Sequence, residues 1–110
     1  MKLPRRVHVG PHTYRVVCDA VAMAVECRDA GEDLVGRCSH RTLTIHIEPD
    51  QAASQMRDTL LHEVLHAVAN MTALDGEWGD EREEETILRL APALLDVLRR
   101  NPRLVAFLTG

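Results

Sequence analysis

The chain has 110 residues, 45% hydrophobic and 27% charged, which is the balance of a globular protein with one hydrophobic core. Thirteen Lys and Arg stand against 17 Asp and Glu, and the formal charge of −4 disfavours nucleic-acid binding, which needs a positive surface. No apolar run is long enough to span a membrane, and no signal-peptide segment follows the basic N-terminus. We therefore expect a cytoplasmic protein with a single domain, residues 1–110, and no membrane or nucleic-acid partner.

The three cysteines indicate neither a disulfide framework nor a cysteine-rich zinc site. Cys18, Cys27 and Cys38 are odd in number, and no two of them form a C-x-x-C pair. We expect reduced thiols in or near the core.

The first half of the chain has the pattern of strands. Residues 6–9 and 13–17 flank a Gly-Pro turn, and residues 34–38 form a third candidate strand. The clearest strand is 42–48, where apolar and polar residues alternate, so one face is expected to be buried and the other polar. Residues 20–30 fit one or two helical turns or a strand. Together these segments predict a small, mostly antiparallel sheet.

The second half has helical periodicity. A first helix is expected from Ser54 to about Met71, and its apolar residues cover most of its circumference, so it is predicted to be buried on most sides. Acidic residues at positions 80, 81 and 83 start a second helix, which runs to about Arg100 before a Pro. Residues 104–108 are predicted as a short helix packing back on the core. The fold class is therefore α+β, with the sheet packed on two long helices.

The buried helix contains a metal-binding pattern. His62 and His66 are four residues apart, so both imidazoles lie on one face and reach a single ion. Glu63 lies about 100° further round the helix, where it would contact a water on that ion as a general base. Asp58 and Asn70 extend the polar stripe by one turn each way, and either could orient a ligand imidazole.

A zinc site with three protein ligands needs one more side chain. No histidine follows His66, so the ligand is a carboxylate or a histidine from the sheet. Among the acids of the second helix, Glu84 lies three residues before Ile87 on the apolar stripe and is the first choice, with Glu83 as its rival. The neighbouring acids Glu81 and Glu85 are expected to face solvent, as are His40 and His46 of the sheet.

These residues resemble a known family. The HExxH pattern with a glutamate on the next helix resembles the gluzincin branch of zincin metallopeptidases. More narrowly, residues 57–68, with the strand 41–47 before them and the segments 90–95 and 101–102 after them, resemble small HExxH proteins encoded by bacteriophages and prophages.

The resemblance implies a minimal zincin-like fold and a zinc metallopeptidase activity. It implies Zn²⁺ held by His62, His66 and Glu84, Glu63 as general base, and a peptide substrate lying along an edge strand, for which 42–48 is the candidate. With Tyr14 as the only tyrosine and no later histidine, no residue is identified that would stabilise the oxyanion. The alternatives are a non-catalytic zinc-binding scaffold or interaction domain derived from a peptidase, and a metal-free interaction domain.

Overall fold

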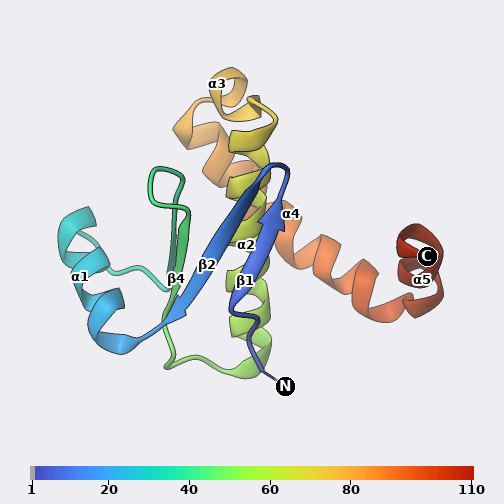
Figure 1. Ribbon diagram of the computed structural model, residues 1–110, viewed down its shortest axis with the longest axis horizontal. Helices are drawn as coiled ribbons and strands as arrows, with labels where there is room; N and C mark the ends of the chain where they lie inside the picture. Colours follow the sequence, from blue (N-terminus) through green and yellow to red (C-terminus); the bar gives the residue numbers. More distant parts are fainter. Residues whose placement is uncertain (1) are drawn as a thin grey trace.

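Strands fill the first half of the chain and helices the second, apart from one helix inserted among the strands (Figure 1). A computed structural model describes residues 2–110, and the predicted α+β class is confirmed. Within this range, no helix has the length and apolar character needed to cross a membrane. The elements are β1 Arg6–Val9, β2 His12–Cys18, α1 Ala20–Ala30, β3 Gly36–Ser39, β4 Thr44–Ile47, α2 Ala53–Met71, α3 Leu74–Trp78, α4 Asp80–Arg100 and α5 Pro102–Thr109.

The sheet has the strand order β1-β2-β4-β3. β1 pairs with β2, and β3 with β4, in antiparallel fashion, so the sheet is mostly antiparallel as predicted. The central pair, β2 and β4, is parallel, with Arg15 opposite Thr44. A parallel pair needs a long crossover connection, and α1 lies within it, which settles the open choice for residues 20–30 as a helix. Asp19 starts that helix by accepting a hydrogen bond from the Ala22 N–H at 2.8 Å.

The strand expected at the sheet edge is an interior one. The prediction that residues 42–48 form the edge strand along a peptide-binding cleft is wrong, because β4 lies between β2 and β3. The second face of β4 is covered as well, since Thr44 is only 3% exposed and α1 packs against β2 and β4. The edge next to β4 is instead β3, a four-residue strand.

One helix, α2, covers a face of the sheet and forms most of the core with it. Its Ala67 packs in a cluster with residues of three strands, namely Val9, Tyr14, Ile45 and Ile47. α4 then packs on α2, burying Ile87 and Ala91. α2 is therefore enclosed between the sheet and α4, as its apolar circumference predicted.

The C-terminal segment does not return to the core. Residues 102–109 form the predicted short helix, but α5 packs mainly against α4 and extends from the body of the molecule (Figure 1). Phe107 is 84% exposed. The chain turns at Asn101, and Pro102 lacks the N–H that would continue α4, so the new helix starts in another direction.

α2 approaches β3 most closely at Gly36. A Cβ atom placed on Gly36 would lie 2.7 Å from Thr59 Cγ2 and 3.0 Å from Glu63 Oε2, closer than packed atoms tolerate.

We predict that Gly36→Ala lowers the free energy of unfolding by about 1–3 kcal/mol, because α2 must shift away from β3. Urea unfolding of the metal-free protein measures this. Gly76→Ala in α3, where a Cβ meets no atom within 4 Å, is the matched control and is expected to leave the free energy of unfolding unchanged or raise it by up to about 1 kcal/mol. Equal stability of the two variants would contradict this close packing.

Candidate metal centre

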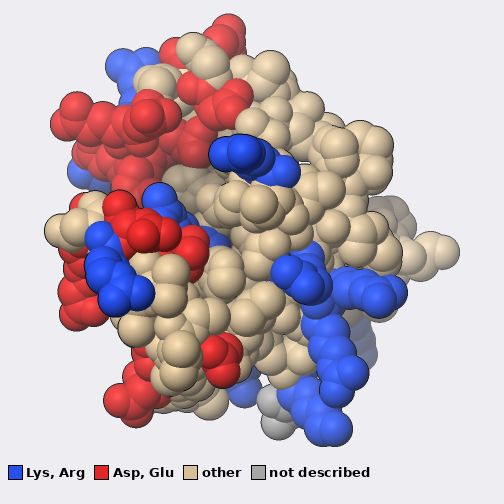
Figure 2. Space-filling view, turned by 60° about the vertical axis from the view of Figure 1, so that its left-hand side comes forward, with Lys and Arg blue, Asp and Glu red and all other residues tan. Residues whose placement is uncertain are grey.

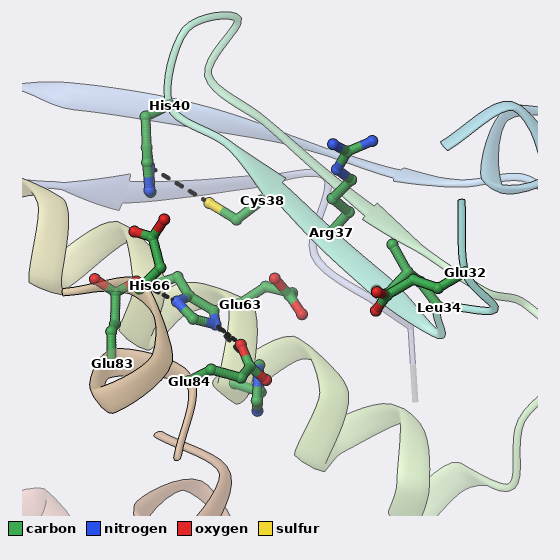
Figure 3. Close-up of a pocket in the computed structure, with 12 residues that line it drawn as sticks. Glu32, Leu34, Arg37, Cys38, His40, Glu63, His66, Glu83 and Glu84 are labelled. Carbon is green, nitrogen blue, oxygen red and sulfur yellow. Dashed lines mark hydrogen bonds and ion pairs between the residues drawn. The ribbon is translucent and has the colours of Figure 1, made fainter. Parts of the chain in front are cut away.

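The candidate metal centre lies where α2, α4 and β3 meet (Figure 3). α2 supplies His62, Glu63 and His66, and the first turns of α4 supply Glu83 and Glu84. Because α2 is packed between the sheet and α4, side chains on adjacent positions face different partners. Glu63 is buried near β3, whereas both imidazoles meet the carboxylates of α4.

Two imidazole nitrogens and the carboxylate of Glu84, through both of its oxygens, converge at one point. His62 Nε2 lies 2.9 Å from Glu84 Oε1, His66 Nε2 lies 2.8 Å from Glu84 Oε2, and the two Nε2 atoms are 3.2 Å apart. The ligand atoms of these three residues all lie within 4.8 Å of one another. The structure thus brings together His62, His66 and Glu84, the set expected from the sequence.

This arrangement fits a zinc ion in both spacing and chemistry. Ligands about 2.0–2.1 Å from a tetrahedral Zn²⁺ lie roughly 3.3 Å from one another, and the observed separations are only a few tenths of an ångström shorter. Two imidazole nitrogens and a carboxylate are also a donor set that zinc prefers, and it leaves a fourth position for water. Without a cation or a shared proton, the lone pairs at this point would repel one another.

Glu83 binds the opposite side of one ligand ring. Its carboxylate pairs with Nδ1 of His66, while Nε2 of the same ring faces Glu84. A carboxylate on Nδ1 keeps the proton there and leaves the Nε2 lone pair free for a metal. The expectation that Glu84 follows the buried stripe is wrong: Glu83 is the buried residue, and Glu84 is exposed. Glu83 is therefore placed to orient a ligand, and Glu84 to be one.

The two imidazoles have opposite pKa shifts. Burial lowers the pKa of His62 below its ordinary value, and the nearby Glu84 only partly offsets this. Burial acts in the same direction on His66, but the hydrogen bond with Glu83 and the charges of Glu63 and Glu84 outweigh it, so the pKa of His66 is raised. In the absence of a metal, a proton on His66 would satisfy the surrounding carboxylates.

Glu63 is a buried carboxyl group beside the ligands. It is 7% exposed and lies against Gly36. Burial raises the pKa of Glu63 to about 7, although the charge of His66 and a hydrogen bond from the backbone of Cys38 act in the opposite direction. A carboxyl group with a pKa near neutrality can both accept and return a proton, as a general base must.

A cavity of about 410 Å³ adjoins the metal centre. Five acidic side chains line it against a single arginine, Arg37, so its potential favours a cation. Figure 2 shows Asp and Glu concentrated on the left of this face, with some Lys and Arg among them, whereas the lower right carries Lys and Arg. The carboxylates of the cavity are those of Glu32, Glu63, Asp80, Glu83 and Glu84.

His40 also lines this cavity, and the prediction that it faces solvent is wrong. It follows β3 directly, two residues after Cys38, which faces α2. The Tyr14 hydroxyl and Nδ1 of His40 form a hydrogen bond of 3.0 Å. Residues two apart on a strand point to the same face, so His40 would be expected to follow Cys38 if the predicted strand 34–38 were extended to Ser39.

The other predicted residues of the polar stripe have different surroundings. Asn70 donates a hydrogen bond to Asp75 at 2.9 Å, so it does not orient a ligand. Asp58 has a buried Oδ1 without a hydrogen-bond partner among the described residues, and its charge opposes the lowering of the pKa of His62. His46 is half-buried on β4 and does not line the cavity at the metal centre.

The cysteines take no part in the ligand set. All three are free thiols, as expected. Cys38 packs against the core, and burial raises its pKa to about 12, which keeps the thiol protonated. Cys18 is exposed, contrary to the expected placement near the core.

Comparison with protein-family models, with curated proteins and with solved structures found no match for this chain.

The two glutamates of α4 make distinguishable contributions to zinc binding. Glu84→Ala removes a ligand atom, so zinc affinity is expected to fall by more than about 100-fold, whereas Glu83→Ala removes only the partner of His66 Nδ1 and weakens binding about 10- to 100-fold. Competition with a chromogenic chelator measures both. If Glu83→Ala alone released the metal, Glu83 would be the ligand.

The raised pKa of Glu63 makes the free energy of unfolding of the metal-free protein depend on pH. Its pKa is raised in the folded state, so the carboxyl group holds its proton below about pH 4.5 in both states, and stability is lost as the pH rises from there through about 7. Glu63→Gln removes this loss, because the amide stays neutral. In urea unfolding with a chelator present, the variant is expected to gain more stability over wild type at pH 8 than at pH 5. Glu81→Gln, at an exposed position of α4, is the control. A gain independent of pH would contradict the assigned shift.

Proposed function

We propose that the protein is a zinc-dependent peptidase of the minimal gluzincin-like kind. The observation that carries the proposal is the placement of Glu63 in the same cavity as three converging ligand atoms, from His62, His66 and Glu84. A structural metal site needs no such group, whereas hydrolysis needs a base beside an open coordination position.

Each group at the metal centre has a separate role in the proposed hydrolysis. Bound Zn²⁺ would lower the pKa of a water molecule and polarise the peptide carbonyl group. Glu63 would be the base that accepts the proton of the attacking water as the water oxygen adds to the carbonyl carbon. It then delivers the proton to the amine nitrogen as the C–N bond breaks. Glu83 keeps the His66 ring in place by binding Nδ1.

The substrate in this proposal is an extended peptide along β3. β3 pairs on one side with β4 and has no strand on its other side among residues 2–110. Gly36, Arg37 and Cys38 of this strand line the cavity at the metal centre. A peptide that added to this edge would have its backbone positioned by main-chain hydrogen bonds, which form with peptides of many different sequences.

The variant Glu63→Gln tests the proposal. Because the amide that replaces the carboxylate cannot accept the proton, peptide cleavage is expected to fall at least about 1,000-fold while the bound zinc stays near one equivalent. A peptide-library cleavage assay and elemental analysis of the purified protein measure the two quantities.

Three outcomes separate the alternatives. Cleavage that survives the substitution contradicts the role of Glu63. Stoichiometric zinc without cleavage in the wild type favours a zinc-binding scaffold. Less than about a tenth of an equivalent of zinc after metal reconstitution contradicts both zinc-dependent functions.

A further inference from the structure

The imidazole of His40 lies on the side of the cavity opposite the histidine ligands, and the proposed peptidase function gives it no role. His40 descends from the end of β3 toward His66 and Glu83 (Figure 3). Its Nδ1 lies 3.0 Å from the Tyr14 hydroxyl and 3.7 Å from Sγ of Cys38, whose protonated thiol can donate to the same nitrogen. His40 therefore belongs to the β3 side of the cavity, where a bound peptide would lie.

Tyr14 determines which nitrogen of His40 carries the proton. The phenol is 1% exposed, and its hydroxyl lies 3.0 Å from Nδ1 of His40. If Nδ1 carried the hydrogen, the Tyr14 hydroxyl hydrogen would have no acceptor among the described residues, at a cost of about 1–3 kcal/mol. Burial raises the pKa of Tyr14, so the phenol stays protonated and donates. The proton of the neutral imidazole is thereby placed on Nε2.

Nε2 of His40 is free to meet a ligand. It forms no hydrogen bond with any described residue, and it is not among the buried polar atoms that lack a partner. The ring is edge-on to Tyr14, with centroids 6.2 Å apart and planes at 88°, and both Tyr14 and Cys38 contact it at Nδ1. Its distal N–H is available to the cavity.

The surroundings of His40 keep the ring neutral. Burial lowers its pKa, and the charge of Glu83 opposes that shift, while His66 strengthens it and Asp75 opposes it again. A neutral imidazole with Nε2–H is a hydrogen-bond donor that adds no net charge to the cavity.

We propose that His40 is the hydrogen-bond donor that stabilises the carbonyl oxygen of the substrate as water adds to the carbonyl carbon, with Tyr14 as the positioning residue that fixes its tautomer. The proposal rests on the proposed peptidase function. No bond to His40 forms or breaks: Nε2–H donates to the oxygen, which gains negative charge as the carbonyl double bond opens, and the proton stays on the ring. A donor of this kind accounts for about 100- to 1,000-fold in rate.

Two substitutions separate this role from a structural one. Asn at position 40 can place an amide oxygen near the position of Nδ1, which keeps the acceptor for Tyr14 but removes the distal donor. Gln at the same position can place an amide N–H near the position of Nε2. His40→Asn is expected to lower kcat about 100-fold with KM and zinc content unchanged, and His40→Gln about 10-fold. His12→Asn, at an exposed histidine outside the cavity, is the control.

Two further measurements do not depend on turnover. Ring ¹⁵N NMR of the metal-free protein, assigned by comparison with His40→Asn, is expected to show the Nε2–H tautomer of His40, and Tyr14→Phe is expected to weaken this preference, leaving only the weaker donor Cys38 at Nδ1. A tripeptide phosphonamidate, which carries tetrahedral anionic oxygen, is expected to bind the zinc-loaded wild type about 100-fold more tightly than His40→Asn.

The outcomes distinguish the donor from the peptidase function. An Nδ1–H tautomer, or a phosphonamidate that binds wild type no better than His40→Asn, overturns the role of His40 even if peptides are cleaved. If no peptide is cleaved while the tautomer and the difference in phosphonamidate affinity are as expected, the peptidase function fails, and with it the role of His40 toward a peptide carbonyl, although Nε2 of His40 still donates to an anionic oxygen at the metal centre.

Discussion

The convergence of two imidazole nitrogens and a carboxylate at one point is the constraint on which this structure depends. His62 Nε2 and His66 Nε2 lie 3.2 Å apart and both face Glu84. In a half-buried place such groups repel unless a cation or a proton lies between them, and their attraction to a cation is stronger there than in water. The fold holds the three together by burying α2 between a sheet and α4, so the imidazoles cannot turn away to solvent.

The same burial gives Glu63 its chemistry. Gly36 allows α2 to approach β3 so closely that Glu63 is withdrawn from water, and this withdrawal raises its pKa. One short stretch of helix thus carries ligands on the side of α4 and a base on the side of β3. The residues that hold the rings in place follow the same division, since Glu83 reaches His66 from α4 and Tyr14 reaches His40 from the sheet.

The sequence predicted features that depend on local periodicity, and it failed where distant segments decide. The α2 helix, the ligand pair on it and the strand at β4 all follow from apolar spacing. Strand order does not, because the pairing of β4 with β2 depends on where α1 carries the chain. Apolar periodicity was used to choose Glu84, but the glutamate on the buried face of α4 is Glu83. Glu84 is exposed and still contacts His62, because a side chain at the rim of a cavity can point inward. The orientation of His40 was not predicted because β3 ends one residue later than its pattern indicated.

The small size of the chain limits how a substrate could be chosen. The cavity has β3 on one side and α2 and α4 on the other, and no further layer of the described chain covers it. A peptide on β3 would be held mainly by its backbone, and main-chain hydrogen bonds carry little information about sequence. The charges around the cavity are then the remaining source of selectivity: five carboxylates against Arg37, of which bound Zn²⁺ would neutralise part. Discrimination in so small an enzyme must rest on charge and on access to the β3 edge more than on shaped side-chain pockets.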